Sequence, residues 1–103
     1  MDFLKLQKDV IKVAHKYSKK NKIKIDKDFA LLKLYEELGE LTQDILIAKK
    51  KSRPEKFVSA KKSKENVANE MADVLGILMI NAYLWNINLE KALENKWLSR
   101  LKK

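Results

Sequence analysis

Apolar residues recur every three or four positions in four segments of the chain, the spacing that places them on one side of an α-helix. These segments cover about residues 2–21, 27–51, 63–85 and 89–100. The stretch from Ser52 to Ser63 has the only Pro, several Lys and little periodicity, and therefore predicts a loop. Four helices joined by short connections predict an all-α fold, a four-helix bundle in which the second and third helices are antiparallel.

Capping residues and apolar stripes support these boundaries. Asp26 and Asn88 precede the second and fourth helices, and Ser63 is a plausible cap for the third, which would begin there or at Lys64. Each helix also carries apolar residues on one side, which we expect to be its buried side. These are Phe3, Leu6, Val10, Val13, Ala14 and Tyr17 in the first helix, Leu31, Leu34, Leu38, Leu41 and Ile45 in the second, and Val74, Ile77, Ile80 and Leu84 in the third.

Length and composition narrow the class of protein. A chain of 103 residues predicts one domain, residues 1–103, with a modest core of the kind that often gains stability by oligomerisation. The absence of Cys excludes disulfides, thiolate metal sites and cysteine nucleophiles. The N-terminus lacks the apolar core of a signal peptide, and the sequence has no unbroken apolar run of ~18 residues. We therefore expect a cytoplasmic protein that does not span a membrane.

The net charge of +9 raises the alternative of a basic helical protein that binds nucleic acid or regulates, without catalysis. Against it, the sequence shows no recognition helix rich in Arg, Asn and Gln. Much of the excess charge lies in Lys clusters at predicted helix ends, where cations interact favourably with the C-terminal end of the helix dipole. These clusters are Lys19–Lys20, Lys49–Lys51, Lys61–Lys62 and Lys102–Lys103.

Two acidic clusters, EELGE at residues 36–40 and EMAD at residues 70–73, are the residues on which the predicted function depends. Glu37 with Glu40 and Glu70 with Asp73 are spaced i, i+3, so each pair lies one turn apart on the same helix face. A helical wheel places Glu70 and Asp73 within the apolar side of their helix. In the other cluster Glu37 flanks the apolar stripe closely and Glu36 lies farthest out. Asp44 falls on the same flank as Glu37.

Carboxylates on an apolar face cost several kcal/mol unless a positive charge compensates them. Buried Lys or Arg partners are one explanation, but only Lys33 lies nearby in sequence. A divalent cation is the other, and several hard oxygen ligands suit Mg²⁺ or Mn²⁺. Zinc and di-iron sites fit poorly because the chain has no Cys and one His, His15, without a carboxylate three residues before it.

The ordered pair of clusters resembles the signature of the MazG superfamily of all-α nucleotide pyrophosphohydrolases, E-E-x-x-E on one helix and E-x-x-D on the next. The resemblance covers about residues 31–100. It implies a MazG-type bundle completed by a homodimer or homotetramer, and Mg²⁺-dependent cleavage of a nucleoside triphosphate between its α and β phosphates. By motif position the metal ligands would be Glu37, Glu40, Glu70 and Asp73. Glu36 and Glu37 would be the catalytic residues, and Glu36 would help with a second metal or with the attacking water.

The fourth helix resembles the family's basic segment near the phosphates. This resemblance assigns substrate binding to Asn95, Lys96 and Arg100, although a solvated basic terminus explains the same residues. Lys96 and Arg100 are spaced i, i+4 and can reach one anion together. Trp85, Trp97 and Tyr35 could stack on a base, but we expect them to pack in the core. The preferred nucleotide does not follow from the sequence.

Overall fold

The computed structural model describes residues 2–101, and all regular secondary structure in this range is helical. Four α-helices are present, as the apolar periodicity predicts, together with two short 3₁₀ helices. The elements are α1 (Phe3–Asn21), α2 (Lys27–Ala48), η1 (Pro54–Lys56), α3 (Ala60–Leu84), α4 (Leu89–Lys96) and η2 (Leu98–Leu101).

Each α-helix begins at a side chain that accepts a hydrogen bond from a backbone N–H three residues later. Asp26 and Asn88 cap α2 and α4 as predicted, and Asp2 caps α1. The prediction for α3 is wrong by one turn, because Ser59 rather than Ser63 accepts the hydrogen bond. Ser63 instead lies inside α3 and is 7% exposed. The predicted loop is correspondingly shorter and contains η1.

Two helices end earlier than the periodicity predicts. The second stops at Ala48, and the left-handed conformation of Lys50, with φ of 58°, turns the chain away. The fourth stops at Lys96, after which the backbone tightens into η2. Lys96 and Arg100 therefore do not lie on one continuous α-helix, and the prediction that the fourth helix runs toward Arg100 is wrong.

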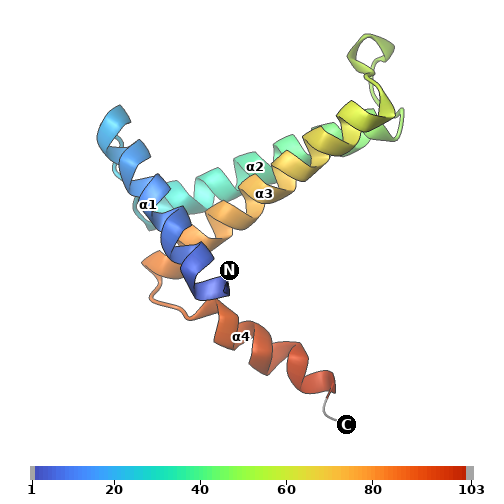
Figure 1. The fold of residues 1–103 in the computed structure, drawn as a ribbon. Coiled ribbons are helices and arrows are strands. Elements are labelled where there is room, and N and C mark those ends of the chain that lie inside the picture. The colour runs from blue at the N-terminus through green and yellow to red at the C-terminus, as the bar shows by residue number, and fades with distance from the viewer. Residues whose placement is uncertain (1, 102–103) are drawn as a thin grey trace.

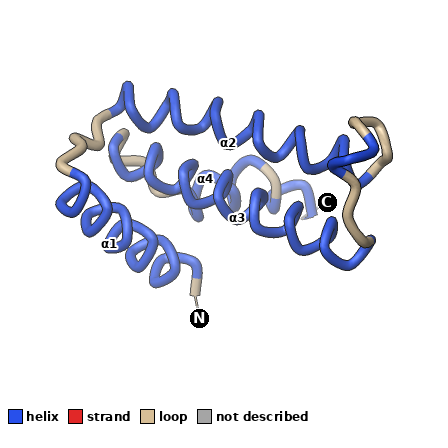
Figure 2. Tube along the Cα trace, turned by 90° about the horizontal axis from the view of Figure 1, so that it is seen from above, coloured by secondary structure: helices blue, strands red, loops and turns tan. Residues whose placement is uncertain are grey.

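Antiparallel packing of α2 on α3 forms the main body of the chain, while α1 crosses α3 near its C-terminal end (Figure 1). The view from above in Figure 2 shows the same pairing of α2 with α3 along their lengths. Asn81 of α3 joins the two helices by donating a hydrogen bond from Nδ2 to the Ala30 carbonyl oxygen, at 3.1 Å. The buried apolar residues are few and lie at these crossings: Ile11, Ala14, Ala30, Met79 and Ala82.

Several residues predicted to be buried are exposed. Val13 on α1 is 67% exposed, and Leu31 and Leu38 on α2 are exposed by 47% and 41%. Trp85, Trp97 and Tyr35 are also exposed, so the prediction that they pack in the core is wrong. The physical reason is that the helix pair has two sides, and within one chain only one of them is covered.

The surface area gives the scale of this incomplete burial. The chain exposes 8300 Å², whereas a compact monomer of 12.0 kDa exposes roughly 6,000 Å². The radius of gyration is 16.4 Å, against about 13 Å for a compact domain of this length. One chain therefore carries about 2,300 Å² of surface beyond that of a closed globule.

The lysine clusters follow the helix ends only in part. Lys19 and Lys20 lie in the last turn of α1, and Lys49 is the C-terminal cap of α2, as predicted. Lys61 and Lys62, however, lie in the first turn of α3, where a positive charge opposes the helix dipole. The prediction that this cluster stabilises the helix dipole is wrong, because Lys61 and Lys62 lie at the N-terminal end of α3 rather than at a C-terminal end. Lys102 and Lys103 lie outside the described residues.

By length and composition, α3 is apolar enough to cross a membrane, with a mean hydropathy of 1.2 over its most apolar stretch. Only 11% of that stretch is buried within the chain. The sequence criterion of an unbroken apolar run does not detect this helix, because polar residues interrupt it. Two of them, Glu70 and Asp73, lie beside the acidic side chains of α2.

Candidate metal centre

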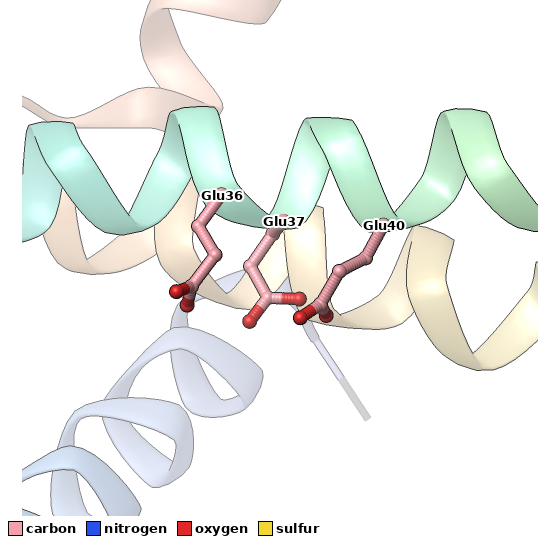
Figure 3. A group of neighbouring side chains, drawn as sticks. All are labelled: Glu36, Glu37 and Glu40. Carbon is pink, nitrogen blue, oxygen red and sulfur yellow. The ribbon is translucent and has the colours of Figure 1, made fainter.

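Acidic side chains from α2 and α3 converge where the two helices pack. Carboxylate oxygens of Glu37, Glu70 and Asp73 lie within 4.8 Å of one another, and the same holds for Glu36, Glu37 and Glu40. Figure 3 shows the three glutamates of α2 pointing to the same side of their helix. Glu37 belongs to both groups, so it connects the two acidic clusters. The prediction that the acidic pairs of the second and third helices face each other is thus confirmed.

Burial is uneven within this acidic centre, which we define as Glu36, Glu37, Glu40, Glu70 and Asp73. Glu37 and Glu70 are half-buried, whereas the other three are exposed. The Oε2 atoms of Glu37 and Glu70 are both buried, and neither has a hydrogen-bond partner in the described part of the chain. A buried carboxylate oxygen without a donor is costly, so these two atoms are the feature of the centre that most needs compensation.

The pKa values of Glu37 and Glu70 are raised, as expected for partly buried carboxyl groups that lie close to other carboxyl groups. Burial, together with the neighbouring carboxyls of Glu40, Asp73 and Glu70, raises the pKa of Glu37 to about 7. Burial also raises the pKa of Glu70, with Glu40, Asp73 and Asp44 adding to the effect. Without a compensating cation, both groups therefore hold a proton more tightly than an ordinary glutamate does.

Lysine partners do not neutralise the centre. Lys33 Nζ lies 2.6 Å from Glu36 Oε1, and this is the one ion pair between a basic side chain and the acidic centre within residues 2–101. Lys33 thus serves the most exposed acid of α2 and leaves Glu37, Glu40, Glu70 and Asp73 without a salt bridge in that range. Within the described residues these four acids form no ion pair with Lys or Arg, so pairing with buried basic residues does not explain their position.

Glu36 has the outward position that the helical wheel predicts, but its carboxylate bends back toward the acidic centre. It is exposed, as expected for the residue farthest from the apolar stripe, and it is paired with Lys33. Its carboxylate nevertheless reaches those of Glu37 and Glu40. A glutamate side chain is long and flexible enough to bend back along its helix, which a wheel of Cα directions does not represent.

Asp44 is a neighbour of the centre that the motif does not include. It is half-buried and contributes to the raised pKa of Glu70 on the facing helix. Its place on the flank of Glu37, one turn beyond Glu40, is the sequence signal that points to it. The spacing alone could not say whether Asp44 faces α3, because that depends on how α2 is rotated against its partner.

The predicted substrate-binding residues are not brought to the acidic centre by the same chain. Asn95, Lys96 and Arg100 are all exposed, and the helix α4 that leads to them extends away from α2 and α3 (Figure 1). The guanidinium of Arg100 instead lies over the ring of Trp97, 5.0 Å from its centroid. His15 is exposed and meets the edge of Tyr83, apart from any acidic group named above.

Comparisons of the chain with models of protein families, with curated proteins and with solved structures find no match. The acidic centre therefore has to be argued from its own residues and geometry.

The raised pKa of Glu37 predicts how stability depends on pH without metal. In the unfolded chain Glu37 loses its proton near pH 4.5, whereas in the folded chain it keeps it up to about pH 7. The folded state binds more protons between these values, so this group lowers stability as pH rises from about 4.5 to 7. In EDTA we expect Glu37→Gln to raise Tm at pH 8 and to lose most of that advantage at pH 5.

The matched control is Glu36→Gln, which removes the same charge from an exposed, ion-paired side chain. It should show no such pH-dependent gain, because its carboxylate is already compensated by Lys33. If Glu37→Gln is less stable than the unmodified chain at pH 8 in EDTA, Glu37 has a structural cationic partner in solution, and this account of the centre is wrong.

Proposed function

We propose that this chain is a Mg²⁺-dependent nucleoside triphosphate pyrophosphohydrolase of the MazG kind. The observation that carries the proposal is the pair of buried, unpartnered oxygens, Glu37 Oε2 and Glu70 Oε2, in two carboxylates that approach within 4.8 Å from two different helices. Two acids in this position call for a positive charge that the described lysines do not supply. The order of the motifs, EELGE followed by EMAD, supports the reaction class through its resemblance to that superfamily.

The chemistry of the donor set fits Mg²⁺ or Mn²⁺. All donors are carboxylate oxygens, which these hard cations prefer, and neither Cys nor His competes within the centre. Glu37, Glu40, Glu70 and Asp73 would hold the ion. When bound, it neutralises phosphate charge and lowers the pKa of a coordinated water. The raised pKa values of Glu37 and Glu70 mean that metal binding competes with protons, so affinity should fall at acid pH.

The remaining chemistry belongs to the chain's own side chains. Glu36 is solvent-accessible and lies beside Glu37 and Glu40, a position from which it can accept a proton from the attacking water. Lys33 forms an ion pair with Glu36, and this contact orients the Glu36 side chain. Water oxygen then bonds to the α-phosphorus, the bond to the α–β bridging oxygen breaks, and pyrophosphate leaves with that electron pair. The products are a nucleoside monophosphate and pyrophosphate.

We further propose that the chain works as a homo-oligomer, at least a dimer. An obligate homodimer buries about 1,000–2,500 Å² per protomer, and the surplus surface of one chain, about 2,300 Å², lies within this range. Exposed apolar side chains on both main helices provide the chemistry for such an interface. They include Leu31, Leu32, Tyr35 and Leu38 on α2, and Met71, Leu75 and Leu78 on α3.

The products of hydrolysis test the reaction. With Mg²⁺ or Mn²⁺, incubation with a panel of nucleoside triphosphates should release pyrophosphate and a monophosphate, and EDTA should stop the release. Direct detection of phosphate species by ³¹P NMR separates the outcomes. Orthophosphate as the first product would mean attack at the γ-phosphorus and would contradict the mechanism. No turnover, together with salt-dependent binding of a DNA duplex, would favour the basic nucleic-acid-binding alternative.

Neutral variants of the four proposed ligands test the metal centre independently of turnover. Glu37→Gln, Glu40→Gln, Glu70→Gln and Asp73→Asn each keep the side-chain shape but remove a charge. We expect each to lose most activity and most of the Tm increase caused by Mg²⁺, which for the unmodified chain corresponds to ~2.7 kcal/mol at a hundred times Kd. In EDTA each should be at least as stable as the unmodified chain, because neutralising one acid relieves repulsion.

Glu36→Gln is the matched control and should have a milder effect on metal binding. If the four neutral variants unfold in EDTA, the acids are structural ion-pair partners and the metal proposal fails.

Sedimentation equilibrium tests the oligomer. At micromolar concentration we expect a mass at least twice that of the 12.0 kDa chain, and Leu38→Asp on the exposed side of α2 should shift it toward the monomer. Val13→Asp, at a more exposed apolar site on α1, is the comparison variant and should leave the mass unchanged. If the unmodified protein has the mass of a single chain, the proposal that it forms a homo-oligomer is contradicted.

A further inference from the structure

The C-terminal part of the chain is a helical arm with little support from the rest of the protein. This arm consists of α4 and η2, residues 89–101, which pack against each other. Every residue from Glu90 to Leu101 is exposed, and Figure 1 shows α4 leading away from the other helices. A short helix of this length is marginal in water unless a partner covers its apolar side.

The arm has an amphipathic arrangement of side chains, which suits packing against another protein surface. Leu89, Leu93 and Trp97 follow one another at intervals of four and form an apolar stripe, in which Trp97 is 60% exposed. Glu90 and Glu94, also spaced i, i+4, lie along one flank of that stripe. The opposite side of α4 carries Lys91. The arm thus presents an apolar ridge with an acidic edge.

A groove elsewhere in the chain has the complementary features. It lies between α1 and the end of α3, has a volume of about 510 Å³, and has an apolar floor made by Leu4, Ile11, Tyr83 and Ile87. Lys8 and Lys12 stand along its α1 side, again spaced i, i+4. The two lysines and the two glutamates of the arm therefore have the same separation, about 5–6 Å between Cβ atoms.

We propose that the arm of a second copy of this chain docks in this groove, with the apolar stripe on its floor and Glu90 and Glu94 against Lys8 and Lys12. Reciprocal docking would make a symmetric exchange of arms between two chains, in which each arm covers the groove of the other. This interface is separate from the acidic centre and does not depend on its activity. It would bury apolar surface that one chain leaves exposed on both elements.

The chain's own geometry argues for a second copy rather than the same arm. Asn86, Ile87 and Asn88 line one end of the groove, and α4 begins at the next residue. The arm therefore starts at the edge of the groove and runs out of it. To lie in its own groove it would have to reverse direction over this connection, where Asn86 already has a left-handed φ of 54° and Asn88 caps α4.

Cross-linking between single-cysteine chains tests the docking, because the chain has no cysteine of its own. A chain with Leu4→Cys, enlarged by a tag, is mixed with an untagged chain carrying Leu93→Cys, and the mixture is oxidised gently. We expect a disulfide-linked pair of one tagged and one untagged chain. Lys91→Cys, on the opposite side of α4, is the matched control and should give little of this product.

The charge match is tested in the same assay. Lys8→Glu with Lys12→Glu in the tagged chain should slow cross-linking about tenfold, a change that corresponds to ~1.4 kcal/mol. Glu90→Lys with Glu94→Lys in the untagged chain should restore the rate. Lys16→Glu with Lys20→Glu makes the same charge change on α1 outside the groove and should have little effect. Circular dichroism of each variant confirms that it is folded.

Three results would overturn the proposal. Equal cross-linking by Leu93→Cys and Lys91→Cys would mean that the arm does not dock with its apolar stripe inward. An intrachain disulfide as the dominant product of one chain carrying Leu4→Cys and Leu93→Cys would assign the groove to its own arm. Loss of cross-linking that reversed charges on the arm do not restore would mean that Glu90 and Glu94 do not face Lys8 and Lys12.

Discussion

The constraint on which the rest of the protein depends is the meeting of like charges where α2 packs on α3. Glu37, Glu70 and Asp73 lie close together there, and the buried oxygens of Glu37 and Glu70 have no donor in the described chain. The same helix pair makes most of the fold, so the chain stabilises itself by a contact that also concentrates negative charge. Raised pKa values are the metal-free consequence, since a proton can take the place of a cation.

The second general property of the molecule is that many apolar side chains remain exposed within one chain. The helix pair covers one side of each helix, α1 covers part of α3, and the arm leaves every residue from Glu90 to Leu101 exposed. The chain has about 2,300 Å² of accessible surface beyond that of a compact monomer, and exposed apolar side chains contribute to it. The same incomplete burial leaves most of the apolar stretch of α3 uncovered. Apolar residues that a second copy would cover look, in one chain, like residues meant for lipid.

The proposed metal centre depends on the positions of carboxylate atoms, the proposed reaction class on the order of two motifs, and the proposed exchange of arms on a groove and a helix with matching charge. The oligomer interface and the arm interface also use different surfaces, α2 with α3 in one case and α1 with α4 in the other. A failure of one proposal therefore leaves the observations behind the other in place.

Local signals in the sequence determined the helices and the pairing of the acids. Apolar periodicity and short-range capping act within a few residues, so four helices, two of the caps and the facing of Glu37 toward Glu70 could be predicted. The start of α3 at Ala60 could not, because Ser59 and Ser63 are equally good caps and packing chose between them. Tertiary structure alone decided that Leu31 and Leu38 are exposed, that Asp44 faces Glu70, and that α4 leaves the body of the chain. These depend on the rotation and crossing of whole helices, which no local pattern specifies.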